Sequence, residues 1–95
     1  MTPEGKVKAA IKRILAAHGC WDVMMVPTGY GKKGVPDFLV CHRGRFIAIE
    51  AKAGAGTPSP HQEREIAAIL AAGGIALVVN ETNLHEVEDV LVRGE

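Results

Sequence analysis

Two acids and a lysine are the side chains of this sequence best suited to chemistry: Asp37, Glu50 and Lys52. Lys52 follows Glu50 by two residues and therefore points to the same face of a strand. Carboxylates without a His or Cys cluster favour Mg²⁺ or Mn²⁺ over zinc. Such an ion can polarise a phosphoryl oxygen and acidify a bound water, while the lysine orients that water or stabilises charge on the phosphate. These residue types therefore predict a metal-dependent site for phosphodiester hydrolysis.

A tight turn is expected to bring the two acids together. Residues 37–42 and 45–52 are β-type runs separated by Arg43-Gly44, a two-residue hairpin connection with glycine where positive φ is needed. In that register Asp37 opposes Glu50, with Cβ atoms about 4.5–5.5 Å apart. Both faces of these runs are apolar, which indicates strands covered on both sides. Because like charges so placed are destabilising, we expect a divalent cation between them.

Two predicted helices each place one polar residue in their first turn, on the face toward the core. Glu4 shares a stripe with Val7 and Ile11, and Gln62 shares one with Ile66. An acid on an apolar stripe is unusual without a partner, so both residues are candidates for the site. Each also has a simpler interpretation: Glu4 as a complement to the helix dipole, and Gln62 as a helix-start residue with no part in catalysis.

The motifs Gly34-Val35-Pro36-Asp37, Glu50-Ala51-Lys52 and Ser59-Pro60-His61-Gln62 resemble the VRR-NUC (virus-type replication-repair nuclease) branch of the PD-(D/E)xK nuclease superfamily. The resemblance extends over nearly the whole chain, from Glu4 to the last predicted strand. Stand-alone members of this branch are typically small viral proteins, and their fold is similar to that of archaeal Holliday junction resolvases. The resemblance implies a PD-(D/E)xK restriction-endonuclease-like core and a Mg²⁺-dependent endonuclease, with Mn²⁺ as a substitute.

The same resemblance implies roles for individual residues. Asp37, Glu50 and the main-chain carbonyl of Ala51 would bind the metal, and Glu4 would assist through a water molecule. The catalytic set would be Asp37, Glu50, Lys52 and Gln62, with Gln62 in a supporting part. The resemblance also implies a homodimer that acts on branched DNA such as Holliday junctions.

Three other functions stay open on the sequence. One is a nuclease that prefers flap, nicked or plain duplex DNA, and a second is a non-catalytic DNA-binding or assembly module of the same fold. A third is a carboxylate–metal site for a small phosphate ester. Glu50 and Lys52 could also form a weak ion pair on a solvated strand face, although their apolar neighbours argue against it.

Contacts to nucleic acid are expected from a basic loop and a basic helix side. Tyr30, Lys32 and Lys33 lie in the glycine-rich loop 27–36, where cations suit phosphates and an aromatic ring suits base stacking. Lys6 belongs to a basic side of the first helix. The alternative is a solvated loop and a solvated helix face. The formal net charge of zero gives no bulk argument for a nucleic-acid partner.

The order of the expected elements predicts an α/β fold. Ninety-five residues allow one domain, 1–95, and 47% apolar with 23% charged residues is a globular composition. The expected elements are a helix to about His18, strands 22–26, 37–42 and 45–52, a helix from Pro60 to about Ala72, a strand 75–79 and a helix 83–93. This α-β-β-β-α-β-α order indicates a mixed β-sheet flanked by helices, with the last strand buried and parallel to a neighbour.

Cellular location is inferred from the N-terminus, the hydropathy and the cysteines. The first residues do not read as a signal peptide, and no apolar run approaches the ~20 residues that cross a bilayer. Cys20 and Cys41 lack metal-ligand spacing and are expected as buried, reduced thiols. We therefore expect an intracellular protein that is neither secreted nor bound to a membrane. Its expected location is the cytoplasm of a host cell, including a virus-infected one.

Overall fold

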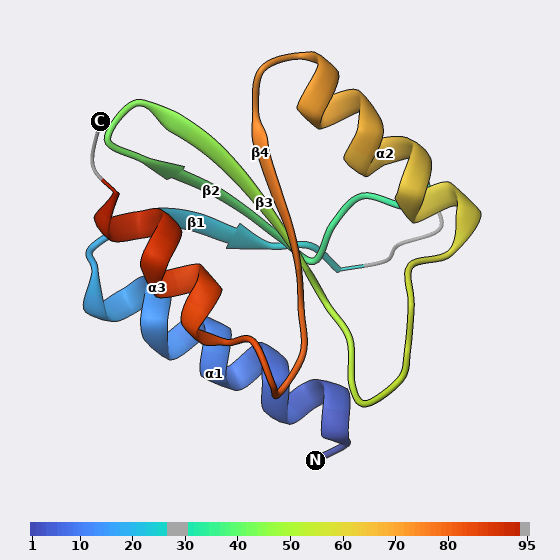
Figure 1. Cartoon of the computed structure of the whole chain (residues 1–95), viewed down its shortest axis with the longest axis horizontal. Coiled ribbons are helices and arrows are strands. Elements are labelled where there is room, and N and C mark those ends of the chain that lie inside the picture. The colour runs from blue at the N-terminus through green and yellow to red at the C-terminus, as the bar shows by residue number, and fades with distance from the viewer. Residues whose placement is uncertain (27–30, 94–95) are drawn as a thin grey trace.

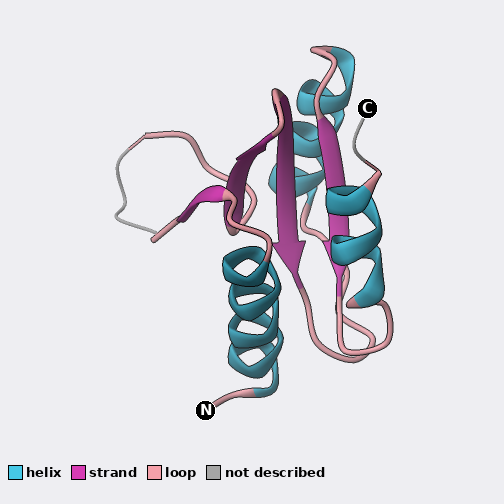
Figure 2. Cartoon of the chain, turned by 90° about the vertical axis from the view of Figure 1, so that its left-hand side faces the viewer, coloured by secondary structure: helices cyan, strands magenta, loops and turns pink. Residues whose placement is uncertain are grey.

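A computed structural model describes residues 1–26 and 31–93 of the protein. Within these ranges the elements are α1 Pro3–Ala17, β1 Trp21–Met24, β2 Phe38–His42, β3 Arg45–Ala51, α2 Pro60–Ala71, β4 Ile75–Val79 and α3 His85–Val92. The strands form one sheet in the order β1-β2-β3-β4 (Figure 2). β1–β2 and β2–β3 are antiparallel and β3–β4 is parallel, so the predicted mixed sheet and element order are confirmed.

Helices lie on both faces of this sheet. α1 and α3 pack side by side on one face, toward the viewer in Figure 2, and α2 lies behind the sheet (Figures 1 and 2). The buried core sits between the sheet and the pair of helices α1 and α3. It comprises Val7, Ile11, Leu15, Phe38, Val40, Ile47, Ile49, Ala51, Val79, Val87, Val90 and Leu91. The side chain of Glu50, between Ile49 and Ala51 of this core, therefore points to the opposite face, toward α2.

The β2–β3 hairpin has the predicted register. Arg43 and Gly44 form its turn with φ values of +53° and +76°, as a two-residue turn of this kind requires. Paired residues run from His42 with Arg45 to Phe38 with Ile49. The paired ladder ends there, so β2 begins one residue later than predicted, immediately after Asp37.

β3 ends at Ala51 rather than at residue 52, and β1 and α3 also differ in their bounds from the prediction. β1 covers 21–24 rather than 22–26, since its ladder to β2 stops at Met24, although the Met25 amide still donates to the Asp37 carbonyl at 2.7 Å. α3 begins at His85 rather than at Asn83, because the Asn83 side chain accepts from the Asn80 amide at 2.7 Å and holds a turn there.

The face of the sheet that carries α2 is only partly covered, which corrects three expectations. Trp21 is 66% exposed, its partner Cys41 is exposed, and Phe46 beyond Cys41 is 44% exposed. The prediction of a buried Cys41 is wrong, as is the prediction that both faces of β2 and β3 are fully covered. β4 is an edge strand, so only Val79 in it is fully buried. We call Trp21, Val23, Cys41 and Phe46 the uncovered sheet face.

Of the helices in residues 1–26 and 31–93, none is long and apolar enough to cross a membrane.

Candidate active site

Glu50 is the buried centre of the candidate site. Its side chain is 2% exposed, on the α2 side of β3. Oε2 accepts a hydrogen bond from Gln62 Nε2 at 2.9 Å and lies 3.2 Å from Lys52 Nζ. Oε1 is buried and has no hydrogen-bond partner. Burial raises the pKa of Glu50 above its ordinary value, and the charge of Asp37 raises it further, while Lys52 opposes both.

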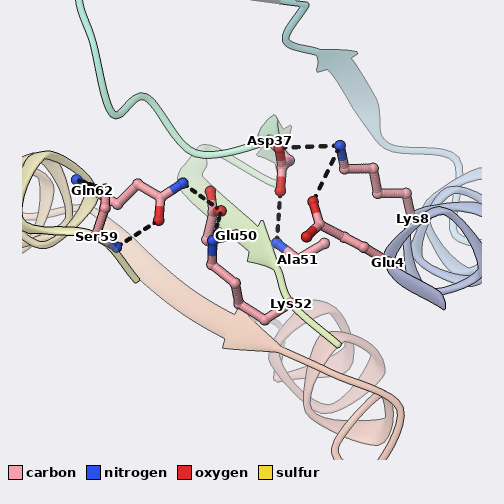
Figure 3. Close-up of polar contacts among 8 residues, drawn as sticks. All are labelled: Glu4, Lys8, Asp37, Glu50, Ala51, Lys52, Ser59 and Gln62. Carbon is pink, nitrogen blue, oxygen red and sulfur yellow. Dashed lines mark hydrogen bonds and ion pairs between the residues drawn. The ribbon is translucent and has the colours of Figure 1, made fainter. Parts of the chain in front are cut away.

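Gln62 has two structural tasks. Its side-chain Oε1 accepts from the main-chain amide of Ser59 at 2.8 Å. The Ser59 hydroxyl accepts from the main-chain amide of Gln62 at 3.2 Å, and the two bonds form a capping box at the start of α2. Its Nε2 is then free to donate to Glu50 (Figure 3). The two interpretations of Gln62 from the sequence are therefore compatible, because the cap fixes which end of the amide faces the acid.

Asp37 lies beside Glu50 at the same end of the sheet (Figure 3). Its Oδ2 accepts from the Ala51 amide at 2.8 Å, and its Oδ1 lies 3.5 Å from Lys8 Nζ. The ladder stops at Phe38, and the Asp37 carboxylate takes a main-chain donor of β3 instead. Its charge still acts on Glu50, as the raised pKa of Glu50 reflects.

Glu4 lies at the margin of the site. Its side chain is 42% exposed and its carboxylate is 3.5 Å from Lys8 Nζ, one turn further along α1. Glu4 is thus only half-buried, at the outer end of a helix whose first buried residue is Val7. Thr2 caps the start of this helix, with its hydroxyl accepting from the Gly5 amide at 3.0 Å.

The segment before Asp37 is fixed against α2. Gly34 has a φ of +80°, and a Cβ placed there would lie 2.4 Å from the carbonyl oxygen of His61. Only glycine allows this approach. Lys32 adds a surface ion pair with Glu65 at 3.3 Å. The buried Pro36 then leads directly to Asp37.

Lys52 is held by contacts between the ends of β3 and β4. Its amide donates to the Val79 carbonyl at 2.9 Å. Two residues later the Gly54 amide donates to the Glu81 carboxylate at 3.1 Å, and Asn80 Nδ2 donates to the Gly54 carbonyl at 3.3 Å. The bond from Gly54 lowers the pKa of Glu81. The main chain around Lys52 is thus fixed on both sides.

The residues present fit a hard divalent cation. Within 1–26 and 31–93, no group of three His, Cys, Asp or Glu side chains converges closely enough to form a metal cage. Mg²⁺ does not need one, since it is usually held by one or two carboxylates and keeps several waters. The unpartnered Glu50 Oε1 offers such a ligand, with the Asp37 carboxylate beside it.

The candidate nucleic-acid residues do not form one cluster. Lys6 lies on α1 in a groove with Pro3, Val7, Glu81 and Leu84. Lys33 is exposed in the loop before Asp37, where Lys32 is paired with Glu65. Tyr30 lies outside the described residues.

Comparison with known proteins supports the motif-based assignment. No protein-family model matches the chain. A solved structure of a "VRR_NUC domain" superposes on it with a TM-score of 0.74 and 26% sequence identity, and the match covers 100% of both chains. The chain has the VRR_NUC fold. The resemblance inferred from the motifs is therefore confirmed.

A sequence relative agrees with this VRR_NUC assignment. "Putative nuclease p44" of Acyrthosiphon pisum secondary endosymbiont phage 1 is 38% identical over 58 residues. The match spans 60% of this chain and 62% of the relative.

The contribution of Lys8 to this VRR_NUC site was missed by sequence reasoning. The sequence indicates for Lys8 only a place on the basic side of the first helix, either solvated or in contact with phosphates, yet it contacts both Glu4 and Asp37 (Figure 3). The spacing of Glu4 and Lys8 by four residues was a visible signal for the first contact. The second contact depends on how α1 docks beside Asp37, which no local pattern specifies.

Proposed function

We propose that this protein is a Mg²⁺-dependent endonuclease that hydrolyses DNA phosphodiester bonds at Asp37, Glu50 and Lys52. One observation carries the proposal: the buried carboxylate of Glu50 has an oxygen with no hydrogen-bond partner, beside a second acid and a lysine. A buried charge without compensation is costly, and a bound cation supplies the compensation. The VRR_NUC fold and the phage relative whose name includes "nuclease" support the same reaction class.

The proposed roles follow from the contacts. Asp37, Glu50 and the carbonyl of Ala51 would hold the metal, with Glu4 assisting through a water. When bound, Mg²⁺ would polarise a phosphoryl oxygen and acidify a water. Lys52, anchored on Glu50 at 3.2 Å, would orient that water or stabilise the charge that develops on the phosphate.

Gln62 is proposed as a supporting residue of the catalytic set. It donates to Glu50 Oε2 at 2.9 Å and is itself fixed by the capping box of α2. That bond occupies one oxygen of Glu50, and the other oxygen, which has no partner, would bind the metal. The helix start thus sets the orientation of a ligand.

DNA contacts are proposed for Lys6, Lys32, Lys33 and Tyr30. Lys32 is 68% exposed in its pair with Glu65, and such a surface pair is weak enough to be exchanged for a phosphate. An intracellular location, which we expect from the sequence, is part of the same proposal.

Branched DNA, such as a Holliday junction, is the proposed substrate, and a homodimer is the proposed assembly. Twofold symmetry would give two sites for paired cuts on a branched duplex. The uncovered sheet face supports a second copy as the partner, because Trp21 and Phe46 leave apolar surface in water. Trp21→Glu should shift the protein to a monomer in sedimentation equilibrium, whereas Leu70→Glu, an exposed residue of α2, should not. Equal behaviour of the two variants would remove this face as the interface.

The decisive experiment is a cleavage panel on four-way, flap, nicked and linear DNA of matched sequence. Wild-type protein is expected to cut in Mg²⁺ or Mn²⁺ and not in EDTA. Lys52→Met and Asp37→Asn are expected to abolish cutting with unchanged far-UV circular dichroism. Lys12→Met, which removes an exposed lysine of α1, serves as the control for loss of charge.

The panel also separates the competing functions. Preferential cutting of flap, nicked or linear DNA would replace the branched substrate with that structure. Binding of branched DNA without cutting in either metal would favour a non-catalytic DNA-binding module. Hydrolysis of bis-p-nitrophenyl phosphate without DNA cleavage would favour a small phosphate ester as the substrate.

A further inference from the structure

Lys8 lies between two acids of the proposed metal site. Its Nζ is 3.5 Å from Glu4 Oε2 and 3.5 Å from Asp37 Oδ1, and its side chain is 31% exposed. Both distances exceed the ~2.7–2.9 Å of a short charge-assisted hydrogen bond. The ammonium group is therefore shared between the two carboxylates rather than bonded tightly to either.

The position of Lys8 conflicts with metal binding at Asp37. Asp37 Oδ2 already accepts a hydrogen bond from the Ala51 amide, so Oδ1 is the oxygen left for a metal. That oxygen faces Lys8 (Figure 3). Two cations cannot approach one carboxylate oxygen without repulsion. A metal that binds Asp37 through Oδ1 must therefore displace the ammonium group.

We infer that Lys8 is a positioning residue that neutralises Glu4 and Asp37 in the metal-free protein and leaves Asp37 when the metal binds. The inference rests on the proposed metal site. A simple helix-surface pair would join Glu4 and Lys8 alone. The contact with Asp37 ties α1 to the start of β2 and has no such local explanation.

The test is the affinity of DNA-free protein for Mn²⁺, measured by calorimetry on four proteins. Lys8→Met removes the competing cation, Lys8→Arg keeps a cation, and Lys12→Met removes an exposed lysine one turn along α1. Lys8→Met should bind Mn²⁺ about 1.5- to 5-fold more tightly than wild type, the range for relief of one partly exposed ion pair, the one with Asp37. Lys8→Arg should stay within about twofold of wild type, and Lys12→Met should change little.

A second readout is thermal unfolding in EDTA and in Mn²⁺. Lys8→Met should show a lower Tm than wild type in EDTA and a larger rise on adding Mn²⁺. If Lys8→Met misfolds by circular dichroism, Lys8→Gln carries the same expectation.

The outcomes separate the inference from the proposed function. Wild-type binding of Mn²⁺ with equal or weaker binding by Lys8→Met would overturn the role of Lys8 and leave the metal site standing. Equal tightening in Lys8→Met and Lys12→Met would also overturn it, since net charge alone would then explain the effect. Absence of Mn²⁺ binding in every variant would overturn both proposals.

Discussion

Raising the pH should destabilise the metal-free protein through Glu50. This carboxylate is 2% exposed, and its pKa is raised, first by burial and then by Asp37. A raised folded-state pKa means that the folded protein binds this proton more tightly than the unfolded chain does. The resulting stability is fully present below the ordinary glutamate value of 4.5 and is lost as the pH rises through the folded-state pKa.

The size of the loss follows from what surrounds the carboxylate. Leaving a buried polar atom unsatisfied, as Glu50 Oε1 is, costs about 1–3 kcal/mol. The Lys52 contact at 3.2 Å and the Gln62 bond at 2.9 Å offset part of this cost. We therefore expect a loss of about 1–2 kcal/mol, which for a domain of this size lowers Tm by about 5–15 °C.

The assay is thermal unfolding in EDTA between pH 4 and pH 8.5, on wild type and Glu50→Gln. Gln cannot ionise, so Tm should fall less with rising pH in the variant than in wild type. Mn²⁺ should restore Tm at high pH in wild type but not in Glu50→Gln. Glu86→Gln, an exposed carboxylate of α3, is the matched control and should follow wild type. Parallel pH profiles for wild type and Glu50→Gln would refute the claim that the Glu50 charge is destabilising.

Two further predictions concern the elements that orient the acids. Gly34→Ala should lower the free energy of unfolding by ~1–3 kcal/mol more than Gly31→Ala in urea unfolding. Both glycines have positive φ, so that cost cancels, and only a Cβ at Gly34 would clash with the His61 carbonyl. Equal losses would contradict this. Gln62→Ala should reduce kcat/KM for DNA cleavage far more than Ser59→Ala, although both remove the cap and each should cost about 1 kcal/mol of stability. Equal effects of these two variants on cleavage would reduce Gln62 to a capping residue.

Local patterns predicted the hairpin well because its register depends on one turn. Apolar runs flank Arg43-Gly44 on both sides, so a single turn geometry sets every pair down to Phe38 with Ile49. The same patterns failed on burial. Cys41 and Phe46 have the composition of covered strand residues, yet α2 leaves them exposed. How far a helix extends across a sheet is a long-range property that strand composition does not encode.

The contacts of the candidate site are of two kinds, those within one helix and those between separate elements. Gln62 and Glu4 each make one contact within their own helix, a cap and an i,i+4 ion pair, which spacing along the chain makes visible. The contacts that bear on chemistry, Gln62 with Glu50 and Lys8 with Asp37, cross between elements and depend on how the helices dock. The contact within each helix orients the side chain that reaches the acid on the sheet, Gln62 toward Glu50 and Lys8 toward Asp37. Each helix start therefore influences both the stability of the protein and the position of one carboxylate. Stability and metal affinity should therefore change together at these positions, except at Lys8. Loss of the Lys8 side chain should lower the stability and raise the metal affinity.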